Sequence, residues 1–260
     1  MQSDSSMTAQ PLAAHSIGLA RYKDLHRWMI LPMAIMQIGI FYDYWGDFSE
    51  NVWAVHIHYW TATFWYLFLI LQPYYATHGQ IDRHRTYGII GMFLAGGVAM
   101  TALSAMGRDT INAGLAARMP GRFGPFEAWF FYGIVAVEAV MIGAFIVAVI
   151  QAIRLRRSLN DHAWWLVSTA FIIMMPALGR GLQAAWSIAL DQNDPRIVTY
   201  PLYLTTAIIL ALLYGAAQKY GRINHPATWL AAGVNLFNLL FEPIGRWGWM
   251  QGVLQSIIKG

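Results

Sequence analysis

Long apolar stretches alternate with short polar or charged segments along most of the chain. A transmembrane helix needs about 20 mostly apolar residues to cross roughly 30 Å of hydrocarbon. Stretches of this kind, bounded by charged or Pro/Gly-rich segments, recur throughout the sequence. They predict seven membrane-spanning helices, over residues 28–45, 52–75, 85–106, 128–152, 163–188, 199–218 and 228–248.

No stretch alternates between apolar and polar residues with a period of two, so the pattern disfavours a β-barrel. Backbone groups in lipid must be satisfied internally, which leaves helices as the spanning element. We therefore predict an all-α, polytopic membrane bundle over residues 28–248, with a polar N-terminal tail (1–27) and a short C-terminal tail (249–260). Pro176 and Pro243 lie inside predicted spans and are expected to kink them.

Composition agrees with this pattern. Hydrophobic residues make up 57% of the chain and charged residues only 12%, against about 25% charged in a typical soluble domain. The 12 Trp and 13 Tyr are suited to membrane–water interfaces. The absence of cysteine excludes disulfides, Cys-ligated zinc and iron–sulfur clusters. The expected partner is the lipid bilayer, and the net charge of +4 indicates no nucleic-acid partner because the basic residues gather at the ends of spans.

The distribution of Lys and Arg predicts an orientation. Cytoplasmic segments of membrane proteins are enriched in these residues, and the first loop carries Asp43, Asp47 and Glu50 with no Lys or Arg. The N-terminus is therefore expected in the cytoplasm and the C-terminus outside. The basic residues on the predicted cytoplasmic side are Arg21, Lys23, Arg27, Arg83, Arg85, Arg154, Arg156, Arg157, Lys219 and Arg222. The loop 107–127, assigned outside despite three arginines, is expected to form a partly ordered cap.

Ionisable residues inside spans are costly and are therefore functional candidates. Glu138 and Arg180 lie roughly 15 Å and 12 Å from the outer ends of their spans at a helical rise of about 1.5 Å per residue. These similar depths predict an ion pair. One interpretation is a structural pair through which two helices recognise each other. The other places one or both groups in a substrate or proton pathway.

Further polar residues lie in the outer half of the predicted bundle. His56 and His58 point about 200° apart on one helix, so they cannot share a metal ion, and His58 is expected to face inward. Glu242 and Arg246 have the spacing of a helical salt bridge. These residues predict a polar cavity that opens outward. They do not predict a metal site. The residues of this outer polar site are His58, Glu138, Arg180 and Glu242.

A second set of histidines lies on the cytoplasmic side. His84 and His162 each begin a predicted helix, at similar depth. A b-type heme needs two axial ligands at one level on facing helices, and His is a common choice. The pair meets this condition and is the candidate ligand set for heme. The alternative is that both are boundary histidines, satisfied by water.

Two segments, residues 58–88, which end in HGQIDRHRTYG, and residues 161–180, DHAWWLVSTAFIIMMPALGR, resemble bacterial multi-pass membrane proteins of the DUF2306 type. The resemblance is one of pattern and covers about half the chain, spans two to five. It implies a bacterial cytoplasmic (inner) membrane protein. The matching residues are His58, Gln72, His84, Arg85, Gly88, His162, Trp165 and Arg180.

That group is distantly similar to four-helix b-type cytochromes, a likeness that implies a redox role and heme b. This chain departs from the two-heme pattern because no span supplies a histidine opposite His58 on the outer side. One heme on His84 and His162 remains as the hypothesis. Leu166 also follows Trp165 where the pattern tends to Met.

The leading hypothesis is therefore a redox-associated membrane protein that binds heme or quinone, with a membrane-protein partner. The alternative is a non-enzymatic membrane subunit or a transporter with an outward-facing polar cavity. A third is a lipid-modifying enzyme that uses Glu138 or Glu242 as an acid. The sequence contains no phosphate-binding glycine loop, HExxH or GxSxG motif, and the last predicted span has no Lys for a retinal Schiff base.

Overall fold

The computed structural model describes residues 19–190 and 194–259, which form helices and no strand. The predicted all-α class is confirmed for these residues, whereas positions 1–18 of the predicted N-terminal tail lie outside them. The helices are α2 (Leu25–Trp28), α3 (Ile30–Gly39), η1 (Tyr42–Gly46), α4 (Trp53–Thr77), α5 (Ile81–Arg118), α6 (Ala128–Arg154), α7 (Leu159–Ile172), α8 (Met175–Ala189), α9 (Arg196–Lys219), α10 (Pro226–Phe237), η2 (Asn238–Leu240), α11 (Phe241–Arg246) and α12 (Gly248–Lys259).

Within residues 19–190 and 194–259, five helical segments are long and apolar enough to cross a membrane: α4, α5, α6, the α7–α8 segment and α9. Large apolar side chains also cover the outside of the bundle, and Phe93 on α5 is 79% exposed. In water such a surface would be an aggregation hazard, whereas hydrocarbon solvates it. The chain is therefore a multi-pass membrane protein.

The first and last predicted spans are interrupted. Residues 28–45 fall in α2, α3 and the π-helical turn η1, while residues 228–248 fall mainly in α10, the 3₁₀ turn η2 and α11. Pro243 lies in α11, just after η2. Proline lacks a backbone N–H and clashes with the preceding turn, which explains a break at this point.

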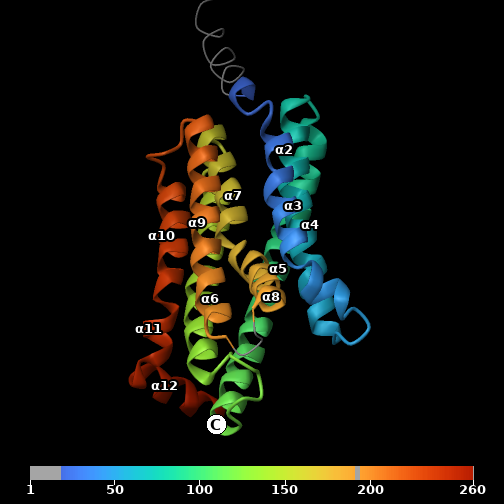
Figure 1. Ribbon diagram of the computed structural model, residues 1–260. Coiled ribbons are helices and arrows are strands. Elements are labelled where there is room, and N and C mark those ends of the chain that lie inside the picture. Colours follow the sequence, from blue (N-terminus) through green and yellow to red (C-terminus); the bar gives the residue numbers. More distant parts are fainter. Residues whose placement is uncertain (1–18, 191–193, 260) are drawn as a thin grey trace, which may run out of the picture.

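Consecutive helices run up and down the bundle (Figure 1). α5 packs between α4 and α6, and α10 packs against α6, α7 and α9. At the lower end in Figure 1, α12 crosses the ends of the other helices and contacts α5, α6 and α11. The segment 249–260, expected as a tail, is thus helical as far as Lys259.

The expected cap over 107–127 is wrong for its first half, because α5 continues as a helix to Arg118. Ala113 and Ala116 are buried there against Phe131 and a leucine of α12. This local apolar cluster stabilises the additional helical turns. A segment whose polarity suggested a loop is therefore helical.

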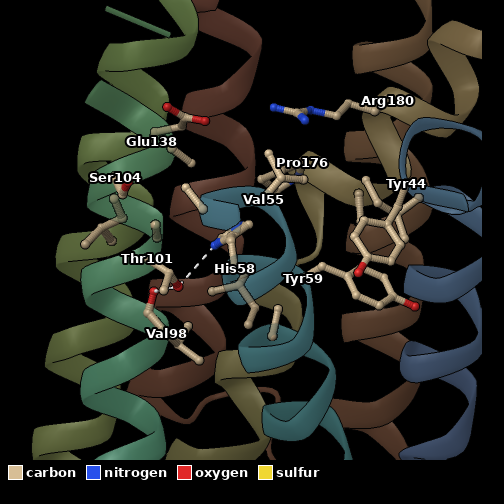
Figure 2. Close-up of a pocket in the computed structure, with 18 of the residues that line it drawn as sticks. Tyr44, Val55, His58, Tyr59, Val98, Thr101, Ser104, Glu138, Pro176 and Arg180 are labelled. Atoms are coloured by element: carbon tan, nitrogen blue, oxygen red, sulfur yellow. Dashed lines mark hydrogen bonds between the residues drawn. The ribbon is translucent and has the colours of Figure 1, made fainter. Parts of the chain in front are cut away.

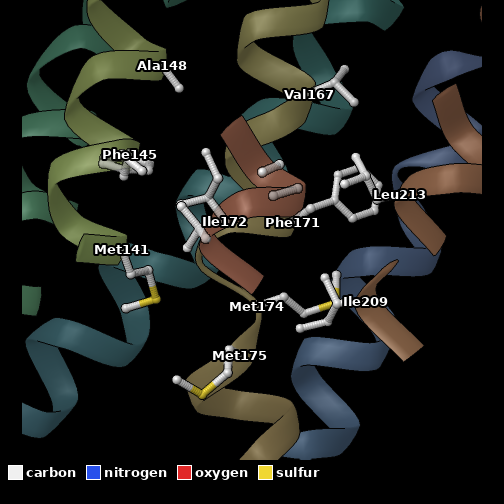
Figure 3. Packing of buried hydrophobic residues seen from close by; sticks show 14 of the residues in the cluster. Met141, Phe145, Ala148, Val167, Phe171, Ile172, Met174, Met175, Ile209 and Leu213 are labelled. Atoms are coloured by element: carbon white, nitrogen blue, oxygen red, sulfur yellow. The ribbon is translucent and has the colours of Figure 1, made fainter. Parts of the chain in front are cut away.

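The main core lies where α6, α7 and α9 meet (Figure 3). Phe171 and Ile172 at the end of α7 are fully buried, as is Met174 in the break that follows. Phe145 of α6 and Ile209 of α9 belong to the same cluster. α7 thus ends inside the closely packed core.

The α7–α8 segment breaks between Ile172 and Met175, and Pro176 lies in the first turn of α8. The expected kink at Pro176 is confirmed. After the break α8 leaves the direction of α7 and packs against α3 (Figure 1). Gly39 and Gly181 make this contact, since a Cβ on either would collide with the backbone of the facing helix.

Candidate functional site

A cavity of about 300 Å³ lies between α3, α4, α5, α6 and α8. The cavity forms because α8 turns away from the direction of α7 at Pro176. The side chains of α8 are thereby separated from those of α6 beside the cavity (Figure 2). Most of the wall is apolar and includes Val98, Met141 and Phe145. The polar residues of the wall are Asp43, Tyr44, His58, Tyr59, Tyr66, Thr101, Ser104, Arg108, Glu138 and Arg180.

His58 projects from α4 into this cavity (Figure 2). Its Nδ1 lies 3.1 Å from Oγ1 of Thr101. The Thr101 hydroxyl donates its one proton to the Val98 carbonyl at 3.2 Å. In that arrangement the hydroxyl accepts from Nδ1–H of His58, and this tautomer of the ring carries its lone pair on Nε2. His56 lies on a different face of α4, where its Nδ1 is 2.8 Å from the Tyr44 hydroxyl.

Arg180 projects from α8, and two acidic residues share its charge. Its Nη1 donates to Oδ2 of Asp43 at 3.0 Å, and its Nη2 lies 3.8 Å from Oδ2 of Asp109. Asp109 also lies 3.9 Å from Nε of Arg108. Arg180 thereby joins η1, α5 and α8 at one end of the cavity.

The expected ion pair between Glu138 and Arg180 is absent from the described residues. The two side chains face each other across the cavity (Figure 2). Glu138 is only 5% exposed, and its Oε2 has no hydrogen-bond partner in the described part of the chain. The depths counted along the helices agree, but the break at Pro176 moves α8 away from α6. Arg180 consequently pairs with Asp43 and Asp109.

Glu242 lies apart from the cavity. Its Oε1 accepts a hydrogen bond from Nε of Arg246 at 3.0 Å, as the four-residue spacing predicts. The Arg246 guanidinium in turn lies over the Trp129 ring, 4.2 Å from its centre. Glu242 and Arg246 thus connect α11 to α6 at the surface.

Sequence reasoning missed Asp109, because it was assigned to a loop. The signal was present, since Thr101, Ser104 and Arg108 recur at helical spacing and indicate one polar face that continues past residue 106. It also missed that Thr101 would orient His58.

His84 and His162 come together at the other end of the bundle. Their ring centres are 6.2 Å apart and the ring planes are perpendicular, at 89°. Nδ1 of His84 is 3.3 Å from the Gln72 carbonyl oxygen, and Nδ1 of His162 is 2.8 Å from the Ala152 carbonyl oxygen. A carbonyl only accepts, so each Nδ1 carries the proton and each Nε2 carries a lone pair.

These donors suit an axial ligand pair, but the space between the helices does not suit a heme. Both rings line a cavity of only about 60 Å³, whereas pockets for ligands of drug size are roughly 300–1,000 Å³. Apolar side chains of α4 and α7, among them Leu69 and Leu166, occupy the surroundings. A tetrapyrrole does not fit this site as the helices are packed.

The Asp161 carboxylate beside His162 on α7 binds a different histidine. Nε2 of His225 lies 3.1 Å from Oδ1 of Asp161, and Nδ1 of His225 accepts the Ala227 N–H at the start of α10. Burial lowers the pKa of His225, although Asp161 acts in the opposite direction. His225 is therefore a neutral helix cap that also joins α10 to α7.

No family model, curated protein or solved structure matches this chain.

Proposed function

We propose that the chain crosses a bacterial cytoplasmic membrane seven times, with its N-terminus in the cytoplasm and its C-terminus outside. The interrupted segments 25–46 and 226–246 supply the remaining two of the seven crossings. Each is about 32 Å long at a rise of roughly 1.5 Å per residue. Both bury residues inside the bundle, including Met36 and Asn235. The basic residues named above lie in the segments that the positive-inside rule assigns to the cytoplasm.

Within this bundle the outer cavity is proposed to bind a quinone, and the protein to take part in membrane redox chemistry. A quinone is a flat apolar ring with two carbonyl groups and a hydrophobic tail. The cavity has matching properties: apolar walls, a few convergent polar groups and a volume of about 300 Å³. Ser104 lines the cavity and is also exposed, so the cavity reaches the outside of the bundle beside α5, where a tail can leave.

The polar groups have complementary roles in this proposal. Nε2 of His58 accepts a hydrogen bond from a quinol hydroxyl, and the Arg180 guanidinium donates to a quinone carbonyl. Glu138, whose Oε2 lacks a partner, accepts or returns a proton. Interconversion of quinone and quinol moves two protons and two electrons. These side chains handle the protons, and a membrane-protein partner exchanges the electrons.

One observation carries the proposal: His58, Glu138 and Arg180 surround a single cavity that otherwise has mainly apolar walls. A purely structural set of polar residues would be expected to satisfy its own hydrogen bonds, because an unpartnered buried group costs about 1–3 kcal/mol. Glu138 does not satisfy this expectation.

The test is a titration of the detergent-purified protein with a short-chain quinone, read by equilibrium binding. Ala102→Phe fills the cavity from α5 and is expected to abolish binding. Leu103→Phe is the matched control, because Leu103 is 42% exposed and lies outside the cavity wall. If the unmodified protein does not bind, or if both variants bind equally well, the quinone proposal is wrong and the transporter or subunit alternative gains.

A further inference from the structure

The His84–His162 pair has the features of a small metal site. Metal-ligating histidines usually donate their other ring N–H to a carbonyl or carboxylate, which fixes the tautomer and leaves the second nitrogen for the metal. Both rings do this here, with the backbone carbonyls of Gln72 and Ala152 as acceptors. Both also line the same cavity.

The spacing of the two rings suits one shared ion. Two metal–nitrogen bonds of about 2 Å each, together with the radii of the two rings, separate the ring centres by about 6 Å. The observed separation is 6.2 Å. A cavity of about 60 Å³ has room for an ion, although it has none for a tetrapyrrole.

The charge around the pair decides which ion is favoured. No third His, Cys, Asp or Glu joins the two histidines among the described residues. The site therefore supplies two neutral nitrogen donors and no compensating negative charge. Desolvation in such surroundings costs more for a divalent cation than for a monovalent one. Zn²⁺ also requires about four ligands. A monovalent d¹⁰ ion accepts two ligands, and imidazole is a good ligand for copper.

A third residue that lines this cavity has a polar group without a partner in the described residues. Gln72 is only 4% exposed and lines this cavity, and its side-chain Nε2 has no hydrogen-bond partner in the described residues. A buried amide N–H normally finds a partner. A water molecule or anion held beside a bound ion would supply the missing acceptor.

We propose that His84 and His162 bind a single Cu(I) ion through their Nε2 atoms, near the cytoplasmic end of the bundle. The site is separate from the outer cavity, so its existence does not depend on quinone binding. Both ligands lie in the first turns of α5 and α7, and the ion would enter from the nearby membrane surface.

The experiment loads the purified full-length protein with copper under reducing conditions and challenges it with a Cu(I) chelator. The expected result is one Cu(I) retained per chain, with a two-coordinate nitrogen shell in X-ray absorption of the unmodified protein. His84→Ala and His162→Gln should each weaken binding by more than the roughly 100-fold that loss of a second-shell partner can cost. His78→Ala is the control, because that exposed ring stacks on Tyr74 and lies outside the cavity wall.

Three results would overturn the proposal. One is copper that the chelator removes from the unmodified protein as easily as from the His84→Ala variant. A second is Zn²⁺ binding as tight as that of Cu(I), since this would remove the argument from charge. The third is a Soret band that is lost in either variant, which would assign the pair to heme. The X-ray absorption result rests on the unmodified protein, so the test stands even if a variant fails to fold.

Discussion

At the scale of single residues, Glu138 and Arg180 differ in how their charges are satisfied. Arg180 has two acidic partners, whereas Oε2 of Glu138 has none among the described residues despite 5% exposure. An unpaired buried polar group costs about 1–3 kcal/mol. A ligand or a proton that binds Glu138 would supply the missing partner, as the quinone proposal requires.

Glu138→Gln should therefore raise the stability of the empty protein, by about 1 kcal/mol or more, because a neutral amide is easier to bury than a carboxylate. It should also weaken quinone binding. Thermal unfolding in detergent measures the first effect. Glu242→Gln is the control, because it breaks an exposed ion pair whose contribution is roughly 0–1 kcal/mol. A Glu138→Gln variant less stable than Glu242→Gln would show that Glu138 already has a partner.

His225 predicts a dependence of stability on pH. Because burial lowers its pKa in the folded protein, the unfolded chain binds a proton first as pH falls through the ordinary value of about 6.5. Stability should therefore decrease as the pH is lowered across this range. In His225→Asn the new residue can still cap α10 but does not titrate. The melting temperatures at about pH 7.5 and pH 5.5 should differ more for the unmodified protein than for His225→Asn. The same difference in both proteins would contradict the role of His225.

The sequence predicted part of the outer site through depth along each helix. His58, Glu138 and Arg180 all line one cavity, because residue counts translate directly into height at a fixed helical rise. Lateral position was not predictable in the same way. The break at Pro176 displaces Arg180 from Glu138, and the break before Pro243 accompanies the placement of Glu242 at the surface.

At the scale of elements, the break between α7 and α8 creates the cavity. Proline predicts an interruption, but the direction that the chain then takes depends on what it packs against. Here α8 packs on α3 through Gly39 and Gly181. Facing glycines on separate helices cannot be paired from one sequence alone, so the cavity was not predictable in detail.

The contact of α6 with α11 offers a matched test of helix packing. A Cβ on Gly133 would collide with the Phe241 backbone, whereas a Cβ on Gly143 of the same helix would meet open space. Gly133→Ala should destabilise the protein by about 1–3 kcal/mol, measured by thermal unfolding in detergent. Gly143→Ala should be neutral or stabilising, since Ala is the better helix former by about 1 kcal/mol. Equal effects of the two substitutions would contradict the packing of α11 on α6.

At the scale of the whole molecule, composition and hydropathy were sufficient to predict a helical membrane protein. In the described part of the chain, the five helical segments long enough to cross a membrane follow from long apolar runs, although one of them is broken between α7 and α8. The interrupted first and last segments follow less directly, because a break depends on local backbone hydrogen bonding that hydropathy does not report. The extension of α5 to Arg118 depends on a contact with α12, which is distant in sequence.

The proposed topology can be tested with single cysteines, because the chain has none of its own. Asp47→Cys and Trp249→Cys should react with an impermeant maleimide added outside intact cells or spheroplasts. Arg157→Cys should react only after the membrane is opened. All three positions are exposed, so access is limited only by the membrane. Labelling of Arg157→Cys in intact spheroplasts would contradict the orientation, and protection of Trp249→Cys would contradict the seventh crossing.

The central claim, that the outer cavity binds a quinone, is tested most directly by photo-crosslinking an azido-quinone to the protein in lipid vesicles. Peptide mapping then locates the labelled residues. The account predicts labels on the parts of α4, α5, α6 and α8 that line the cavity, competed away by unlabelled quinone. Labels confined to the lipid-facing surface, or labels that excess quinone does not remove, would contradict it.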